Sequence, residues 1–295
     1  MKVKATSPGS WLAFRWIDQR VRTSFTSRGS GLLQLQMTRR IACLYLLADL
    51  LITGHALTAP ATKGAFFRPL LDELLDKLER IEGGDLRERP GFSFSLGCDK
   101  WRSSGYMGGV TGWSSAGRVR WASASTIEAE EGSGKDFSSL DLTVFVDAPL
   151  DVPHMRLCLV RSNSSSSCRV QLDYLPRQDL FASFEYFDKY FLGLEGGAAP
   201  QSPLMISRLI TSPFAVEVEA SSLSQASLIC HEHADRWCRW MVNATSTPEV
   251  SARNERDANM ARLMYEEYKV RYANIMGADF APFAEPVAKA CMGPG

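Results

Sequence analysis

The sequence predicts an α/β fold in which an antiparallel β-sheet carries helices on its faces. The apolar runs 155–160 and 170–174 are joined by a tip of serine and asparagine, a pattern that favours a β-hairpin. Pro176 ends the second strand because proline has no N–H to donate to a sheet. Over 180–191 the apolar spacing changes to three and four residues, which is the period of a helix. Strands joined by hairpins and followed by helices pack as a sheet covered by helices.

The rest of the chain after residue 60 follows the same rules. An amphipathic segment that begins at Arg68 and stops before Gly83-Gly84 predicts the first helix. Alternating apolar residues predict strands, and apolar residues three or four apart predict helices. The further predicted strands are 119–125, 140–147, 204–211 and 214–220, and the further predicted helices are 223–242, 250–276 and 283–291.

Residues 1–60 have the composition of a targeting region. Residues 1–36 are basic, and Met37 is followed by two arginines, an apolar stretch over 41–52 and a run of small residues. This is the layout of a cleavable signal peptide, and its apolar stretch is shorter than the roughly 20 residues that span a bilayer. We therefore expect an upstream segment and a signal peptide from Met37 within 1–60, then a single domain over 61–295 without a stable membrane span. A buried core helix is the alternative for 41–52.

Charge and composition argue against several classes of function. Lysine plus arginine and aspartate plus glutamate both number 33, so the formal net charge is zero, whereas a surface that binds nucleic acid is basic. No glycine-rich loop follows a predicted strand and opens a helix, so nucleotide and flavin cofactors have no support. The seven cysteines are scattered without a CxxC pair, which favours buried small side chains over a disulfide framework.

One cluster of metal-ligating residue types lies within the predicted helix 223–242. It contains Cys230, His233 and Cys238. On a helix these three positions do not share one tight face, and a zinc site needs convergent ligands. We therefore expect no metal site.

The predicted helix 250–276 carries an acid on its apolar side. The apolar stripe consists of Met260, Leu263, Met264, Tyr268 and Ile275. At about 100° per residue, Glu267 falls within this stripe. Burial of a carboxyl group raises its pKa, and a carboxyl that is protonated near neutral pH can donate a proton. The alternative is an ion pair between Glu267 and Arg271, one helical turn further on.

Three stretches of the sequence carry a resemblance to a known family. They are the hairpin followed by VQLDYLPRQD and FEYFDKYF, the segment SPLMISRLITSPFAVEV over 202–218, and RDANMARLMYEEYKVRYANIMG over 256–277. In this order they resemble red chlorophyll catabolite reductase, a relative of the ferredoxin-dependent bilin reductases, over residues 115–295. The resemblance implies a bilin-reductase-like α/β/α sandwich, with helices on both faces of the antiparallel sheet and a pocket between the sheet and the C-terminal helices. It also implies reduction of an open-chain tetrapyrrole from chlorophyll breakdown, with electrons from reduced ferredoxin and no bound cofactor.

The resemblance assigns a catalytic role to the long helix. In the family this helix supplies an aspartate that protonates the tetrapyrrole. Alignment back from Gly277 places that acid at Glu267, whereas alignment forward from Asp257 places Tyr268 there. Glutamate keeps the acidity of aspartate but moves the proton by about one methylene group.

The family's second carboxylate lies in the strand after Pro153-His154, and this chain departs from the family there. The matching position is Cys158, or Leu159 if the register slips by one residue. A thiol donates a proton only weakly at its usual pKa. Proton delivery then falls to Glu267, helped by His154 or Cys158, or the chain has lost the reaction. Core packing is the alternative role for Cys158.

Arg208 stands among apolar residues on the predicted strand 204–211. The resemblance makes it a candidate clamp for a propionate of the tetrapyrrole, because a guanidinium matches a carboxylate with two hydrogen bonds. An outward-facing strand position is the alternative explanation. Ser207, its neighbour, and His154 complete the expected substrate-binding residues.

The expected function and location each have a rival. We expect a reductase in the plastid, reached through a secretory-type bipartite sequence whose junction suits TAPATKGAFF over 58–67, as in algae whose plastids lie within the secretory system. A non-catalytic tetrapyrrole carrier on the same fold is the alternative function, favoured by Cys158. A secreted protein is the alternative location, and the sequons at Asn163 and Asn243 would suit it. The expected partners are ferredoxin and a linear tetrapyrrole, with homodimerisation left open.

Overall fold

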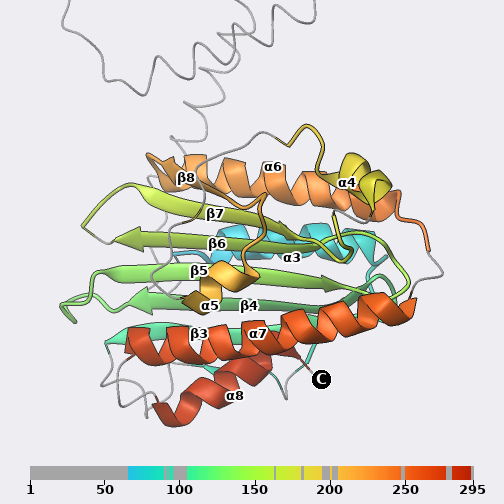
Figure 1. The fold of residues 1–295 in the computed structure, drawn as a ribbon. Helices are drawn as coiled ribbons and strands as arrows, with labels where there is room; N and C mark the ends of the chain where they lie inside the picture. The colour runs from blue at the N-terminus through green and yellow to red at the C-terminus, as the bar shows by residue number, and fades with distance from the viewer. Residues whose placement is uncertain are drawn as a thin grey trace, which may run out of the picture. The chain divides into compact units, whose positions relative to one another are not determined.

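An antiparallel sheet of eight strands forms the middle layer of the computed structural model (Figure 1). Seven strands follow the spatial order β1-β3-β4-β5-β6-β7-β8, and β2 also pairs with β3. From β3 to β7 each strand pairs with the next one along the chain, so this part of the sheet is a meander. The strands are β1 (Arg87–Glu88), β2 (Phe94–Ser95), β3 (Tyr106–Ser114), β4 (Val119–Ala129), β5 (Phe137–Val146), β6 (His154–Ser162), β7 (Cys168–Leu175) and β8 (Val216–Ala220).

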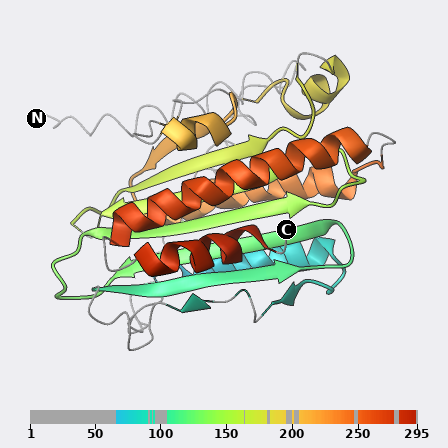
Figure 2. The ribbon, with the colours of Figure 1, turned by 60° about the horizontal axis from the view of Figure 1, so that its bottom comes forward.

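Helices cover both faces of the sheet. The helices are α3 (Arg68–Ile81), α4 (Phe184–Tyr190), α5 (Met205–Ile210), α6 (Leu223–Val242), α7 (Val250–Met276) and α8 (Ala281–Met292). α3 and α6 pack against one face, and α7 and α8 pack against the other (Figure 1, Figure 2). The short helix α5 contacts α7. The predicted α/β/α sandwich is therefore confirmed.

The structure describes residues 66–89, 92, 94–95, 105–162, 164–180, 183–194, 200, 205–246, 250–276 and 281–293. The predicted targeting region over 1–60, with its signal peptide from Met37, lies outside these residues, as do Asn163 and Gly277. Among the helices of the described part, none combines the length and the apolar character that crossing a bilayer requires.

The two faces of the sheet differ in chemistry because successive residues of a strand point to opposite sides. On β5, Leu140, Leu142 and Val144 are fully buried in the core shared with α3 and α6. The residues between them, Asp141 and Thr143, lie within hydrogen-bond distance of the Tyr268 hydroxyl on α7. The face under α3 and α6 is thus the larger apolar core, and the face under α7 carries polar groups.

Trp237 fixes α6 to the sheet. Its side chain is fully buried, and its indole N–H donates to the carbonyl oxygen of Pro153 at 2.9 Å. The helix begins after Ser222, whose hydroxyl accepts a hydrogen bond from the backbone N–H of Gln225 at 3.2 Å. This cap explains why α6 begins where the sequence pattern predicts.

A buried network of three residues fixes the first half of α7 to the sheet. The Asp257 carboxylate accepts from Arg177 at 2.6 Å and lies 3.1 Å from Nε2 of His154. His154 Nδ1 accepts from the backbone N–H of Val146 at 3.0 Å, so Nε2 carries the proton and donates it to Asp257. Arg177 also donates to two backbone carbonyl oxygens in the turn between β5 and β6. Both ring nitrogens of His154 therefore have structural partners.

The network sets the charge states of its members. Burial lowers the pKa of His154 to about 4, although the hydrogen bond to Asp257 favours the protonated ring. Burial raises the pKa of Asp257, but His154 and Arg177 outweigh it and bring that pKa to about 2. At neutral pH the ring is therefore neutral and the carboxylate is ionised.

The strand predicted over 204–211 is wrong, because residues 205–210 form the helix α5. The segment is short and mostly apolar, so its residues fit an alternating pattern and a helical pattern equally well. Ser207 and Ile210, three residues apart, are the buried residues of α5, and this spacing is helical. The edge of β7 is already paired with β8, which begins at Val216.

The helix predicted over 180–191 is confirmed only for α4, and β1 to β3 were not predicted.

Replacing Trp237 with phenylalanine should destabilise the protein. The smaller ring leaves a cavity and leaves the Pro153 carbonyl without its donor, which together should lower the free energy of unfolding by about 2 kcal/mol. Chemical denaturation would measure this change. Leu228→Ala on the same helix is the control: Leu228 is 59% exposed, so the change should stay within about 0.5 kcal/mol. Equal effects of the two variants would contradict the role given to Trp237.

Acid should destabilise the protein through His154. Its folded pKa of about 4 lies below the ordinary histidine pKa of 6.5, so the unfolded chain binds more protons between these values. Stability is then fully present above pH 6.5 and is lost as the pH falls toward 4, by about 3 kcal/mol for this residue. In denaturation curves at pH 7 and pH 4, His154→Gln should reduce the loss by about that amount. The comparison with wild type cancels other groups, including His233, and an unchanged loss would contradict the prediction.

Candidate functional site

Polar side chains gather on the face of the sheet that α7 covers. The central strands each place polar residues on this side at alternate positions, while leucines and valines fill the opposite face. The polar residues are Asp141 and Thr143 on β5, Arg156 and Cys158 on β6, and Gln171 and Asp173 on β7. From above, α7 contributes Glu267, Tyr268 and Arg271.

Two carboxylates and two guanidiniums form a buried charge cluster between β5, β6 and α7. Arg156 Nη2 lies 3.3 Å from Glu267 Oε2 and 3.6 Å from Asp141 Oδ2. Arg271 Nη1 lies 2.9 Å from Asp141 Oδ2 and 3.8 Å from Glu267 Oε1. The two positive charges balance the two negative charges, as the burial of ionised groups requires.

Asp141 is held in its ionised form. Its Oδ1 accepts from the Tyr268 hydroxyl at 2.8 Å. Burial raises the pKa of Asp141, but Arg271, Arg156 and the Tyr268 hydroxyl outweigh burial and bring the pKa to about 2. Burial lowers the pKa of Arg156, while Glu267 and Asp141 raise it above its ordinary value. Asp141 and Arg156 therefore carry full charges at neutral pH.

Glu267 is buried, as its place in the apolar stripe of α7 predicts, and its carboxyl group has polar partners. Its side chain is 2% exposed, and Oε1 accepts from the Ser207 hydroxyl at 3.0 Å. The ion pair with Arg271, the alternative from the sequence, is present at 3.8 Å, and Arg156 on β6 is the nearer cation. Tyr268, the residue that the other alignment register selects, is also buried and bonds to Asp141.

Cys158 lines a small hollow next to the charge cluster. The hollow has a volume of about 30 Å³ and lies between Arg156, Cys158, Gln171 and Asp173 on the sheet and Thr211 and Ala215 after α5. Burial raises the pKa of Cys158 to about 12, so the thiol stays protonated. A small-molecule site usually measures about 300–1,000 Å³. The described residues thus enclose far less space than the expected pigment pocket.

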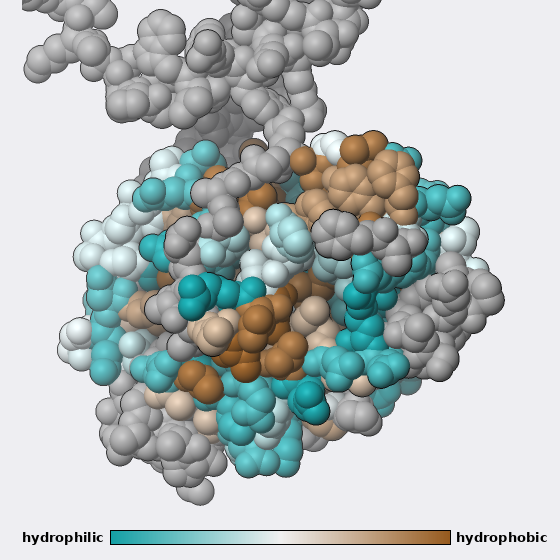
Figure 3. Space-filling model, viewed as in Figure 1, coloured by the Kyte–Doolittle hydropathy of each residue, from teal (hydrophilic) through white to brown (hydrophobic). Residues whose placement is uncertain are grey.

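Helix α5 lies beside α7 on this face and presents apolar residues to solvent. Met205 and Leu209 are 70% and 63% exposed. In the space-filling view, apolar residues gather in the middle of this face (Figure 3). Two serines tie the α5 segment inward, since Ser207 donates to Glu267 and Ser212 donates to Asp173. Both buried carboxyl groups are therefore covered by the same short segment.

Asp173 is the functional candidate that the sequence analysis missed. Its Oδ2 accepts from the backbone N–H of Ser212 at 2.9 Å, and its Oδ1 accepts from the Ser212 hydroxyl. Burial raises the pKa of Asp173 to about 6, although both bonds from Ser212 favour the ionised form. The signal was present in VQLDYL, where the acid lies between apolar Leu172 and Tyr174 in a predicted strand.

The other predicted substrate-binding residues are not brought together. Ser207 is buried beside Glu267, whereas Arg208 is exposed on α5 and does not lie on a strand. His154 is buried within the network with Asp257 and Arg177, four residues before Cys158 on β6.

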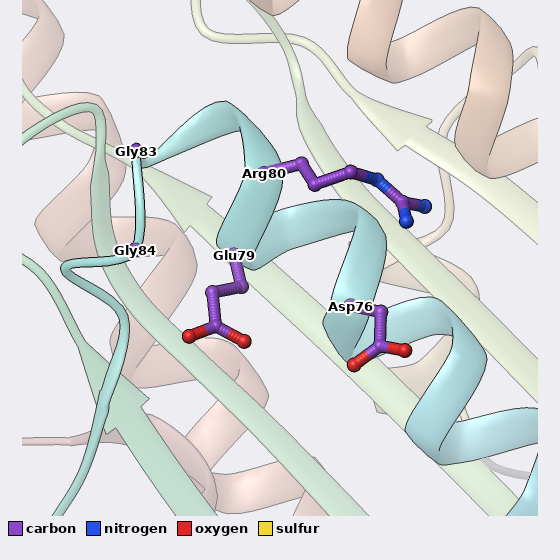
Figure 4. Close-up of a pocket in the computed structure, with 5 residues that line it drawn as sticks. All are labelled: Asp76, Glu79, Arg80, Gly83 and Gly84. Carbon is purple, nitrogen blue, oxygen red and sulfur yellow. The ribbon is translucent and has the colours of Figure 1, made fainter.

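No three histidine, cysteine, aspartate or glutamate side chains converge on a possible metal position in the part of the chain that the structure describes. On α6, Cys230 and His233 are buried, and His231 instead contacts Glu73 of α3 at 2.6 Å. An open depression of about 360 Å³ lies at the end of α3, lined by Asp76, Glu79, Arg80, Gly83 and Gly84 (Figure 4). The Arg80 side chain points away from the two carboxylates (Figure 4). This depression belongs to α3, which covers the opposite face of the sheet from α7.

Comparison with known proteins supports the fold. No family model matches the chain, and no curated protein matches its sequence. Among solved structures, the chain matches phytochromobilin synthase from tomato, determined in complex with biliverdin. The TM-score is 0.55 with 16% identity, and the match covers 78% of this chain and 85% of that chain. The chain therefore has the fold of phytochromobilin synthase.

Proposed function

We propose that this protein binds a linear tetrapyrrole under α5 and α7 and reduces it with electrons from ferredoxin. The observation that carries the proposal is the cluster of ionisable side chains on the face of the sheet under α7. The chain has the fold of phytochromobilin synthase, whose matching structure was determined in complex with biliverdin. The resemblance to red chlorophyll catabolite reductase over residues 115–295 favours a substrate of the red chlorophyll catabolite type. Such a pigment carries propionates, so it needs cations as well as apolar walls.

The charge cluster can supply these cations. Arg156 and Arg271 are 12% and 16% exposed, whereas the carboxylates that hold them are 2% exposed. Arg156 also lines the hollow beside Cys158, so a propionate that enters the hollow can meet its guanidinium. A guanidinium can accept a carboxylate through two parallel hydrogen bonds. These two arginines are better placed for this role than Arg208, which lies exposed on α5.

The reaction needs two electrons and two protons for each double bond that is reduced. Two reduced ferredoxins would each supply one electron, and the protein would position the pigment and supply protons. Glu267 is the first proposed donor, on the helix side of the pigment. It can reach a substrate only after the Ser207 hydrogen bond opens, because that bond and Arg156 now occupy its carboxyl oxygens. The hollow of about 30 Å³ must also widen.

A tetrapyrrole carrier is the second candidate function. The resemblance implies a carboxylate where this chain has Cys158, whose pKa of about 12 keeps the thiol from acting as a strong acid. The contacts of Glu267 also favour the carrier, because Arg156 and Ser207 occupy its carboxyl oxygens.

The proposal predicts both binding and turnover. Adding a linear tetrapyrrole should change the absorbance spectrum of the pigment at a one-to-one ratio, and reduced ferredoxin should then bleach the bound pigment. Binding without bleaching would select the carrier, and an unchanged spectrum would contradict both functions.

Glu267→Gln should lower the turnover rate by about 100-fold, because the amide cannot donate the proton. Glu266→Gln is the matched control, since Glu266 is about half exposed and pairs with Lys269. Circular dichroism would check that both variants fold, since the change of Glu267 to glutamine leaves the charge of Arg156 less well compensated. A Glu267→Gln enzyme with wild-type turnover would remove Glu267 from the reaction.

A further inference from the structure

We propose that Asp173 is a second proton donor, acting on the bound pigment from the sheet side. This inference rests on the proposed function and extends it, because the reaction takes up two protons and the helix offers one donor. Asp173 lines the hollow together with Cys158 and Arg156. Its position, its hydrogen bonds and the contrast with the other buried acids each support the assignment.

The position of Asp173 follows from the register of β6 and β7. Cys158 pairs with Gln171, and Arg156 pairs with Asp173. Asp173 is therefore the diagonal neighbour of Cys158 on the same face of the sheet, about 7–8 Å away by the usual spacing of such pairs. A carboxyl group stands one strand away from Cys158, and both border one hollow.

The other buried carboxyls of this region are committed to cations. Asp141 and Glu267 each lie within 4 Å of Arg156 and Arg271, and Asp257 pairs with Arg177. Within the described residues, Asp173 forms no ion pair at that distance. Burial without a paired cation favours the protonated carboxyl, and burial raises the pKa of Asp173 to about 6.

The hydrogen bonds of Asp173 suit a group that gives up a proton. The backbone N–H and the hydroxyl of Ser212 both donate to its carboxyl oxygens. These donors stabilise the carboxylate that remains after transfer, so the acid can release its proton in a buried place. Ser212 lies two residues after the end of α5, and movement of this segment would change how firmly Asp173 holds its proton.

Three groups near Asp173 keep their charge state near pH 6. Arg156 on β6 has a raised pKa and stays charged, and burial keeps Cys158 protonated. On the opposite face of the sheet, burial lowers the pKa of His233 on α6 to about 3, so this ring is neutral. On α7, Glu267 pairs with Arg156. A variant of Ser212 can assign a change in activity near pH 6 to Asp173, because the Ser212 hydroxyl bonds to Asp173 whereas Glu267 accepts from Ser207.

The proposed step balances as follows. One reduced ferredoxin gives an electron to the bound pigment, the O–H bond of the Asp173 carboxyl breaks, and a new bond to hydrogen forms on the pigment. A second reduced ferredoxin supplies the second electron, and the second proton enters from water through Glu267 after the contacts of its carboxyl oxygens with Ser207 and Arg156 have opened. The two carboxylates then regain protons from water.

Asp173→Asn is the first test, using the full chain, a linear tetrapyrrole and reduced ferredoxin. Asparagine can still accept from the Ser212 N–H but holds no transferable proton. We expect pigment affinity within about threefold of wild type and turnover lower by about 100-fold. A pigment radical should accumulate in electron paramagnetic resonance spectra, because electrons arrive faster than protons. Asp151→Asn is the matched control, a buried carboxyl that accepts from Tyr190 and pairs with Lys189, and its turnover should be unchanged.

Ser212→Ala is the second test, and it decides the matter if Asp173→Asn does not fold. Wild-type turnover should fall as the pH rises above about 6, because the protonated carboxyl is the active form. Removing the Ser212 hydroxyl takes a hydrogen bond from the carboxylate, so this fall should move up by about one pH unit.

The outcomes separate this inference from the proposed function. If the wild-type protein reduces the pigment, normal turnover in Asp173→Asn or an unchanged pH profile in Ser212→Ala overturns the role of Asp173. Either result leaves the reductase in place. Wild-type protein that binds no pigment, or binds it without reduction, overturns the reductase and this inference together.

Discussion

The balance of four charges beneath α7 is the constraint on which this face of the protein depends. A buried carboxylate or guanidinium is stable only beside an opposite charge, and removing one member of such a pair costs about 3–5 kcal/mol. Asp141 and Arg156 come from neighbouring strands, and Glu267 and Arg271 come from successive turns of α7. All four can pair only when the helix lies in one register on the sheet. Asp257, about three turns earlier, fixes the same register through His154 and Arg177.

The layers of the fold could be predicted because each depends on a pattern within one segment. The bounds of α6 and α7 agree with the predicted 223–242 and 250–276, since a helical period over twenty or more residues is hard to mistake for another structure. α5 shows the opposite case, because six apolar-rich residues fit both periods and the partner that decides between them lies elsewhere in the chain.

The candidate site could be predicted only in part. The stripe on α7 was enough to predict that Glu267 is buried, but its nearest cation comes from a strand 111 residues earlier, and Arg271 meets Asp141 across 130 residues. No spacing within a helix reveals such partners, because they depend on how strands and helices are placed in space. Asp173 was missed for the same reason: its importance follows from the hollow that it shares with Cys158, and that hollow exists only in the folded chain.

The neutrality of the cluster has a consequence for any anionic guest. Because Arg156 and Arg271 are already matched by Asp141 and Glu267, the interior holds no surplus positive charge there. A pigment that carries propionates would make the buried region net negative. Uptake of protons together with the pigment would restore neutrality. Affinity would then strengthen in more acidic solution. In the proposed reductase, loading the pigment would also bring in protons that the reduction consumes, so binding and protonation would be one event.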